Sequence, residues 1–169
     1  VWNAGDDSGW RGGHDMVISN NTFYSTYDDM QLFMNFSGER EAIDTTLVDN
    51  IFVFAGENAT WGSVPTAERD MVLDNNIVIG LDEENHGQLT DDPLLVAPGL
   101  ETTEIDMRDP ERLGGYRLCA GSPAIGAGKE GDNEADVDYW QAAINSENIG
   151  AYGGQGLECN ELNGGTQDG

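Results

Sequence analysis

Short apolar segments alternate with polar corners along the first half of the chain. The segment HDMVISNNTF, residues 14–23, recurs as RDMVLDNNIV, residues 69–78, and more loosely as IDTTLVDNIF, residues 43–52. Each copy places Val, Ile, Thr or Phe on both sides of an Asn, which predicts two short strands joined at a polar corner. No long 3.6-residue periodicity accompanies them, so the pattern favours an all-β protein.

Three columns of matching residues run through the three copies. They are Asp15, Asp44 and Asp70; Asn21, Asn50 and Asn76; and Phe23, Phe52 and Val78. The Asn residues are 29 and then 26 positions apart, and a period between about 20 and 50 residues is typical of β-solenoids. Because stacked turns lie about 4.8 Å apart, each Asn could donate its side-chain amide to the next Asn. We therefore expect a buried column of hydrogen-bonded amides, although Asn-Asn is also an ordinary turn dipeptide.

The Asp column needs a different environment, because stacked carboxylates cannot be buried without partners. We expect Asp15, Asp44 and Asp70 to point to solvent. The alternative is a bound cation between two of them, with Ca²⁺ as the candidate cofactor.

The sequence changes character from Asp91 onwards. DDPLLVAPG, GYRLCAGSPAIGAGK and NIGAYGG together resemble the closing turns of the right-handed parallel β-helix proteins of the pectate-lyase-like superfamily. The resemblance implies a right-handed parallel β-helix, and it departs from the family at Gly126 and Asn148, where the family often has Asp. Any polar tie made by those acids is therefore expected to be absent or altered.

This resemblance suggests a division of the chain. We expect β-helix turns over residues 1–128, a C-terminal cap over 129–152 and a loose Gly- and Asn-rich tail over 153–169. No cap-like segment begins the chain, so we expect it to be the C-terminal part of a longer coil. Preceding turns, or another chain, would then stack at the Val1 edge.

Charge excludes some partners. Thirty-two acidic residues oppose seven basic ones, a formal net charge of −25, which disfavours binding to nucleic acid or to an anionic membrane. Adaptation to high salt and a calcium-loaded extracellular surface would both explain this composition. No apolar run approaches the length of about 18 residues that a membrane span needs.

Two cysteines, Cys119 and Cys159, lie in the C-terminal third. In an extracellular or cell-surface protein they would form a disulfide, and otherwise they would be two buried thiols. Three Asn-x-Ser/Thr sequons begin at Asn20, Asn35 and Asn58, which leaves glycosylation open.

Candidate catalytic residues are few. A lyase of this superfamily needs a base and a positive group, and a hydrolase needs paired carboxylates. The candidates are Arg11, His14 and Arg69 in the repeating part, together with Asp6 and Asp7, an acidic doublet near the repeating face. His14 and Arg69 occupy equivalent places in two copies of the repeat and could line one edge of the same sheet face. Alternatively, they could be exposed residues at the start of a strand, with no function in binding or catalysis.

Two tryptophans are candidates for stacking on a sugar ring. Trp10 lies beside two acids in GDDSGWRGG, and Trp61 lies in ENATWGS, which we expect to be a loop. Packing beneath a loop is the alternative for both.

The resemblance implies an extracellular carbohydrate-active protein, a polysaccharide lyase or glycoside hydrolase, with a polysaccharide or cell-surface glycan as its partner. The alternative is a non-catalytic structural or adhesive protein of a surface or filament. A sugar-binding module without catalysis is a third hypothesis.

Overall fold

The computed structural model describes residues 14–33, 43–62, 72–81, 86–99, 110–129, 136–144 and 147–159. The elements are β1 (His14–Ser19), β2 (Thr22–Ser25), β3 (Gln31–Phe33), β4 (Ile43–Val48), β5 (Ile51–Phe54), β6 (Thr60–Gly62), β7 (Val72–Asp74), β8 (Ile77–Ile79) and the 3₁₀ helix η2 (Pro110–Tyr116). Every strand among them is short, with three to six residues.

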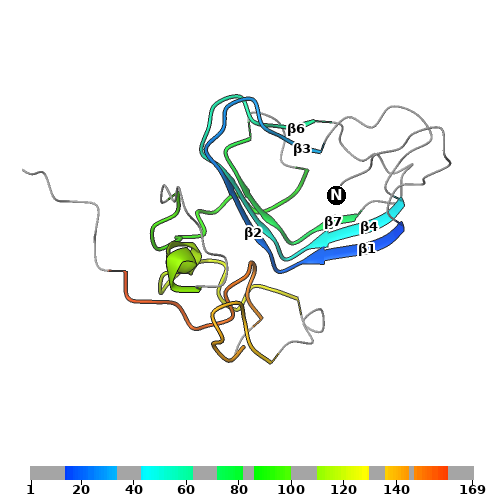
Figure 1. Ribbon diagram of the computed structural model, residues 1–169. Helices are drawn as coiled ribbons and strands as arrows, with labels where there is room; N and C mark the ends of the chain where they lie inside the picture. The colour runs from blue at the N-terminus through cyan, green and yellow to red at the C-terminus, as the bar shows by residue number, and fades with distance from the viewer. Residues whose placement is uncertain are drawn as a thin grey trace, which may run out of the picture.

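The strands form three parallel sheets, which Figure 1 shows stacked one copy of the repeat upon the next. Their orders are β1-β4-β7, β2-β5-β8 and β3-β6. The register pairs Ile18 with Leu47 and Leu47 with Leu73, so equivalent positions of the repeat lie side by side. The repeat in the sequence is therefore a repeat in space.

Each polar corner uses two adjacent residues for two purposes. The first residue has a left-handed backbone conformation: φ is 54° at Asn20, 55° at Asp49 and 51° at Asn75. Asn and Asp tolerate this conformation better than other non-glycine residues. The second residue, Asn21, Asn50 or Asn76, turns its side chain into the stack.

These second residues form a continuous column of hydrogen bonds. The Asn21 amide donates to Asn50 Oδ1 at 3.2 Å, and the Asn50 amide donates to Asn76 Oδ1 at 3.0 Å. The backbone N–H groups of Asn21 and Asn50 donate to the same oxygens, at 3.0 Å in both cases. Asn50 and Asn76 are buried, with 0% and 1% exposed, and the column satisfies groups that would be costly to bury alone.

The sheet β2-β5-β8 is covered on both faces. Phe52, Phe54 and Val78 pack with Leu47 and Trp61 on one side. On the other side, Ile51 and Ile77 pack against a cluster from the C-terminal segment, Leu118, Ala124, Ile149 and Tyr152. The alternation along β5 is the period of two expected of a strand, and both of its faces are apolar because both are buried.

The C-terminal segment is tied to the corner residues. The Asn20 amide donates to the Asn148 carbonyl at 2.9 Å, and the Asn75 amide donates to the Ala127 carbonyl at 2.8 Å. The Lys129 N–H donates to Asp49 Oδ2 at 2.8 Å, and the Gly150 N–H donates to the Asp49 carbonyl at 2.7 Å. The left-handed corner residues therefore fix this segment along the outside of the sheets (Figure 1).

The prediction of a right-handed parallel β-helix is wrong. Among the residues that the structure describes, regular strand pairing is confined to two three-stranded sheets and one two-stranded sheet. Beyond Ile79 the described residues form isolated bridges, and Leu95 with Leu118 is antiparallel. The described part of the chain is a small, mostly β domain with short parallel sheets and one 3₁₀ helix.

The physical reason lies in residues 86–128, which we expected to form further turns. This stretch contains Pro93, Pro98, Pro110 and Pro123, and proline cannot donate to a strand ladder. Within the described part of this stretch, Leu118 and Ala124 are buried against Ile51 and Ile77 on the outer face of β2-β5-β8.

Candidate functional site

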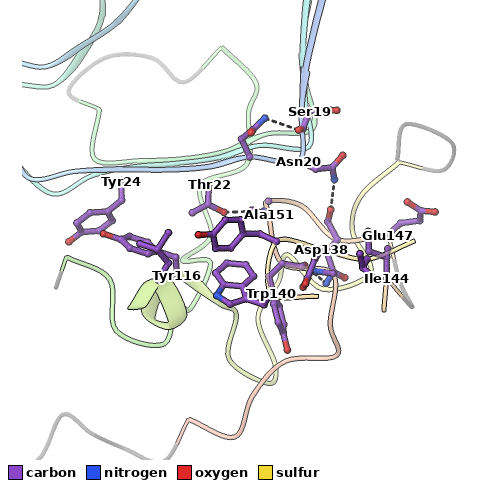
Figure 2. Close-up of a pocket in the computed structure, with 18 residues that line it drawn as sticks. Ser19, Asn20, Thr22, Tyr24, Tyr116, Asp138, Trp140, Ile144, Glu147 and Ala151 are labelled. Atoms are coloured by element: carbon purple, nitrogen blue, oxygen red, sulfur yellow. Dashed lines mark hydrogen bonds between the residues drawn. The ribbon is translucent and has the colours of Figure 1, made fainter. Parts of the chain in front are cut away.

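The candidate site is a cleft between the first corner of the sheets and the C-terminal segment. Its volume is about 670 Å³, within the range typical of small-molecule sites. One wall is made by residues 19–22 and Tyr24, and the other walls come from Leu113, Tyr116 and residues 137–140, 144, 147–148 and 150–153. Figure 2 shows Tyr24 and Tyr116 at one end, Trp140 in the middle, and Asp138 and Glu147 towards the other end.

Aromatic rings from three parts of the chain line this cleft. They are Tyr24, Tyr116, Tyr139, Trp140 and Tyr152. The Tyr24 and Tyr116 rings meet edge to face, with centroids 5.9 Å apart. The Trp140 ring likewise meets Tyr139 at 5.2 Å and Tyr152 at 5.9 Å. Such edge-to-face pairs hold large apolar side chains in defined orientations.

A tight turn presents Tyr139 and Trp140. Val137 and Ala143 form an antiparallel bridge at its base. The Asp138 carboxylate accepts hydrogen bonds from the Ala142 N–H at 2.9 Å and from the Gly153 N–H at 3.0 Å. Asp138 is only 8% exposed, and the two backbone N–H groups compensate its buried negative charge. Its contacts make it a positioning group that joins the turn to Gly153.

The wall formed by the sheets is joined to the C-terminal segment by polar contacts. Thr22 Oγ1 accepts a hydrogen bond from the Ala151 N–H at 3.1 Å, and Figure 2 shows this contact between the strands and Trp140. Asn148 Oδ1 accepts from the Gly126 N–H at 2.9 Å, and its amide donates to the carbonyls of Tyr152 and Gly154, both at 2.8 Å. Gly126 and Asn148 thus form a polar tie in which the acceptor is an amide oxygen.

The charge in the cleft is acidic. Asp138 and Glu147 line it, and none of the described lining residues is Lys or Arg. Both Asp138 oxygens already accept backbone hydrogen bonds, which hold the turn in place. The arrangement suits the binding of a ligand through apolar faces and hydroxyl groups.

Most of the catalytic candidates lie outside the described residues. These are Asp6, Asp7, Arg11 and Arg69, and the same holds for Trp10 and for Asp70 of the Asp column. The backbone of His14 belongs to β1 and pairs with Ile43 in β4. Asp15 and Asp44 lie next to these partners in the same two strands, and the side chains of His14, Asp15 and Asp44 are likewise outside what the structure describes.

The interpretation of Trp61 as a sugar-stacking residue in a loop is wrong. Trp61 belongs to strand β6 and is 1% exposed. Its side chain packs in the interior with Phe52 and Phe54, and its ring meets the His86 ring edge to face at 5.4 Å. Trp61 lies between Thr60 and Gly62 in this three-residue strand, and its side chain points to the interior cluster.

Cys119 and Cys159 are joined by a disulfide, with Cα atoms 5.4 Å apart. The bridge lies where Leu157 pairs with Cys119 in a parallel bridge. Among the residues that the structure describes, no group of three or more His, Cys, Asp or Glu side chains could hold a metal ion. Ca²⁺ binding by the Asp column stays a prediction.

Sequence reasoning missed two features of the structure, one in the amide column and one in the cleft. Gln88 extends the amide column, because its Oε1 accepts from the Asn76 backbone N–H at 3.1 Å and from the Asn76 amide at 2.8 Å. Its position, 12 residues after Asn76, breaks the repeat spacing that identified the other members. Tyr24 and Tyr116 were also missed as site residues, because only the tertiary fold brings them together.

A scan against protein-family models finds no match for this chain, and a search of curated proteins finds none either. Within the described ranges, no helix has both the length and the apolar character needed to cross a membrane.

Proposed function

We propose that this protein binds a neutral carbohydrate in the aromatic cleft and that it does so outside the cell. The observation that carries the proposal is the convergence of five aromatic side chains on a cleft of about 670 Å³. The resemblance of the C-terminal sequence to carbohydrate-active proteins is consistent with it.

The chemistry of a sugar ring fits these walls. A pyranose presents C–H groups on its faces, which pack on aromatic rings, and hydroxyl groups around its edge. Tyrosine and tryptophan combine an apolar ring with a polar group, so they can contact both. Thr22 and Glu147 add hydrogen-bonding groups to the same walls.

Electrostatics favour a neutral sugar over a uronate. A polyuronate would bring negative charge next to Asp138 and Glu147, with no Lys or Arg among the described lining residues. The net charge of −25 would add long-range repulsion at low ionic strength. A neutral oligosaccharide meets neither penalty.

Binding can be measured by isothermal titration with neutral oligosaccharides and with oligouronates of matched length. We expect saturable binding of at least one neutral sugar. Tyr139→Ala and Tyr116→Ala should each weaken it about tenfold or more, as loss of about 1.4 kcal/mol of contact would. Tyr27→Ala is the matched control, because Tyr27 is 75% exposed and is not among the lining residues.

The proposal fails if no neutral sugar binds, or if Tyr27→Ala weakens binding as much as the cleft variants. Thermal unfolding of each variant, measured alongside, separates loss of binding from loss of folding. Product formation from any polysaccharide would instead favour the lyase or hydrolase hypothesis, whose candidate residues Asp6, Asp7, Arg11 and Arg69 lie outside the described ranges.

A structural or adhesive role is a second candidate, favoured by one observation. The strands β1, β2 and β3 each lie at the end of their sheet order, and Val17 and Phe23 are 66% and 44% exposed there. The Phe23 ring stacks on Phe52 at 4.8 Å, with an angle of 6° between the rings. An exposed strand edge beside apolar side chains is a surface on which further strands can pair.

Sedimentation of the full chain across a range of concentrations tests this role. Self-association that Phe23→Ser abolishes would support it, and a monomer at all concentrations would contradict a filament subunit. Neither result alters the expectation for sugar binding in the cleft.

A further inference from the structure

We infer that Asn58 is a site of N-linked glycosylation and that Asn20, which begins an equivalent sequon, is not. The two sequons are Asn58-Ala59-Thr60 and Asn20-Asn21-Thr22. Both end in Thr, and both asparagines have left-handed backbones, with φ of 56° and 54°. The two asparagines therefore cannot be distinguished by sequence or by local conformation. They differ in the tertiary contacts of their side chains.

The Asn58 side chain is accessible. Asn58 is exposed, and it follows β5 in the bend before β6. Its amide donates to Asp29 Oδ1 at 3.3 Å, a contact that is itself exposed. A glycan on this nitrogen would leave the burial of Ala59 and Trp61 unchanged, because both of those side chains lie on the inner side of the chain.

The Asn20 side chain is committed to the fold. Its amide nitrogen donates to the Asn148 carbonyl at 2.9 Å, across 128 residues of sequence. Thr22, the third residue of this sequon, accepts a hydrogen bond from the Ala151 N–H through its hydroxyl oxygen. A glycan on Asn20 would place a sugar on the nitrogen that contacts the Asn148 carbonyl, where the C-terminal segment meets the sheets.

The Cys119–Cys159 disulfide supports passage through the compartment where this modification occurs. Stable structural disulfides form in oxidising compartments, and Asn-x-Ser/Thr is modified on exported proteins. The donor is a lipid-linked oligosaccharide diphosphate. The Asn58 Nδ2 forms a bond to the sugar C1, the bond from C1 to the diphosphate oxygen breaks, the lipid diphosphate leaves, and the amide loses one proton.

The test is site-resolved mass spectrometry of the full chain, exported from a eukaryotic secretory host. Enzymatic release of the glycan in heavy-oxygen water converts a modified Asn to labelled Asp, which identifies each site. In the fraction that contains the Cys119–Cys159 linkage, we expect label at Asn58 and none at Asn20. Thr60→Ala should abolish the label at Asn58, and Thr60→Ser, which keeps the sequon, should retain it.

Folded protein without a glycan at Asn58 would overturn the inference, and so would folded protein that carries one at Asn20. The disulfide linkage in the same peptide map reports folding, so an unmodified Asn58 cannot be attributed to misfolded material. The inference does not depend on sugar binding in the cleft, and either can fail without the other.

Discussion

At the scale of single residues, the corner pairs explain why two polar residues recur together. Asn20, Asp49 and Asn75 adopt the left-handed conformation and hold the C-terminal segment. The residue after each of them enters the amide column. Either role alone would favour a polar residue at one position, and the two together require a polar pair.

The centre of the column should be more sensitive than its end. In Asn50→Asp the side chain loses its donor, and a carboxylate would face the carbonyls of Ile18 and Val48, which now accept at 2.8 and 3.0 Å. Because the site is fully buried, we expect a loss of about 3 kcal/mol or more in the free energy of unfolding. Asn21→Asp, at the partly buried end, should cost about 1 kcal/mol.

Urea unfolding followed by circular dichroism measures both values. Equal losses in the two variants would show that the column does not stabilise the protein through its buried hydrogen bonds.

At this scale the sequence was a good guide where residues repeat. Matching positions identified Asn21, Asn50 and Asn76 without any structure, because stacking places equivalent residues in contact. Gln88 was not predicted, because a single Gln after an interval of 12 residues matches neither the spacing of the three Asn residues nor their residue type. Trp61 was misplaced because its strand is only three residues long, too short for an alternation to be recognised.

At the scale of elements, β5 lies at the centre of the molecule. It is the middle strand of its sheet, and its side chains enter both apolar clusters. Gly150, in the C-terminal segment, lies close to this strand. A Cβ built on Gly150 would lie 2.5 Å from Ile51 Cδ1 and 2.9 Å from Thr22 Oγ1.

Gly150→Ala tests the docking of this segment, and Gly121→Ala is its matched control. Both glycines have positive φ, 90° and 85°, but nothing lies within 4 Å of a Cβ built on Gly121. Gly121→Ala should cost about 1 kcal/mol of stability, the conformational term. Gly150→Ala should cost about 2–4 kcal/mol, because the steric clash adds to that term.

Thermal unfolding of the two variants measures the difference. Similar melting temperatures would indicate that the C-terminal segment is not packed against β5 as described.

The elements themselves were only partly predictable. The strands around each corner could be predicted from the Val, Ile, Thr and Phe residues that flank each Asn. Phe52 and Ile51 are neighbours in one strand and therefore lie on its two opposite faces, both of them buried. The path of residues 86–128 did not follow, because a stretch rich in Pro and Gly carries no periodicity that distinguishes a further turn from a segment covering a sheet. The aromatic cleft depends on that path, so it could not be predicted either.

At the scale of the whole molecule, the net charge and the disulfide have opposite effects on stability. The net charge of −25 on 169 residues destabilises the compact state through self-repulsion. The disulfide joins residues 40 positions apart and limits the freedom of the unfolded chain.

Salt should stabilise the protein. Raising NaCl from about 0.1 M to about 1 M shortens the screening length from about 10 Å to about 3 Å. We expect the urea midpoint to rise with NaCl, and CaCl₂ at matched ionic strength to add little, as salt adaptation requires. A large additional effect of CaCl₂ would support the alternative of a calcium-loaded surface.

Removal of the disulfide should lower stability without loss of the sheets. For the double variant Cys119→Ser, Cys159→Ser we expect a loss of about 2–4 kcal/mol, the usual cost for a loop of this length. Because both cysteines lie outside β1–β8, the far-ultraviolet spectrum of the folded state should persist. A variant as stable as the parent protein would contradict this expectation.

The spacing of the amide column has a consequence for how this chain can change. Successive members are separated by 29, 26 and 12 residues, yet each meets the next at hydrogen-bonding distance. The stacking therefore depends on the corners and not on the number of residues between them. The intervals between corners are free to lengthen or shorten over evolution. Insertions and deletions in related chains should concentrate in those intervals and spare the corner pairs.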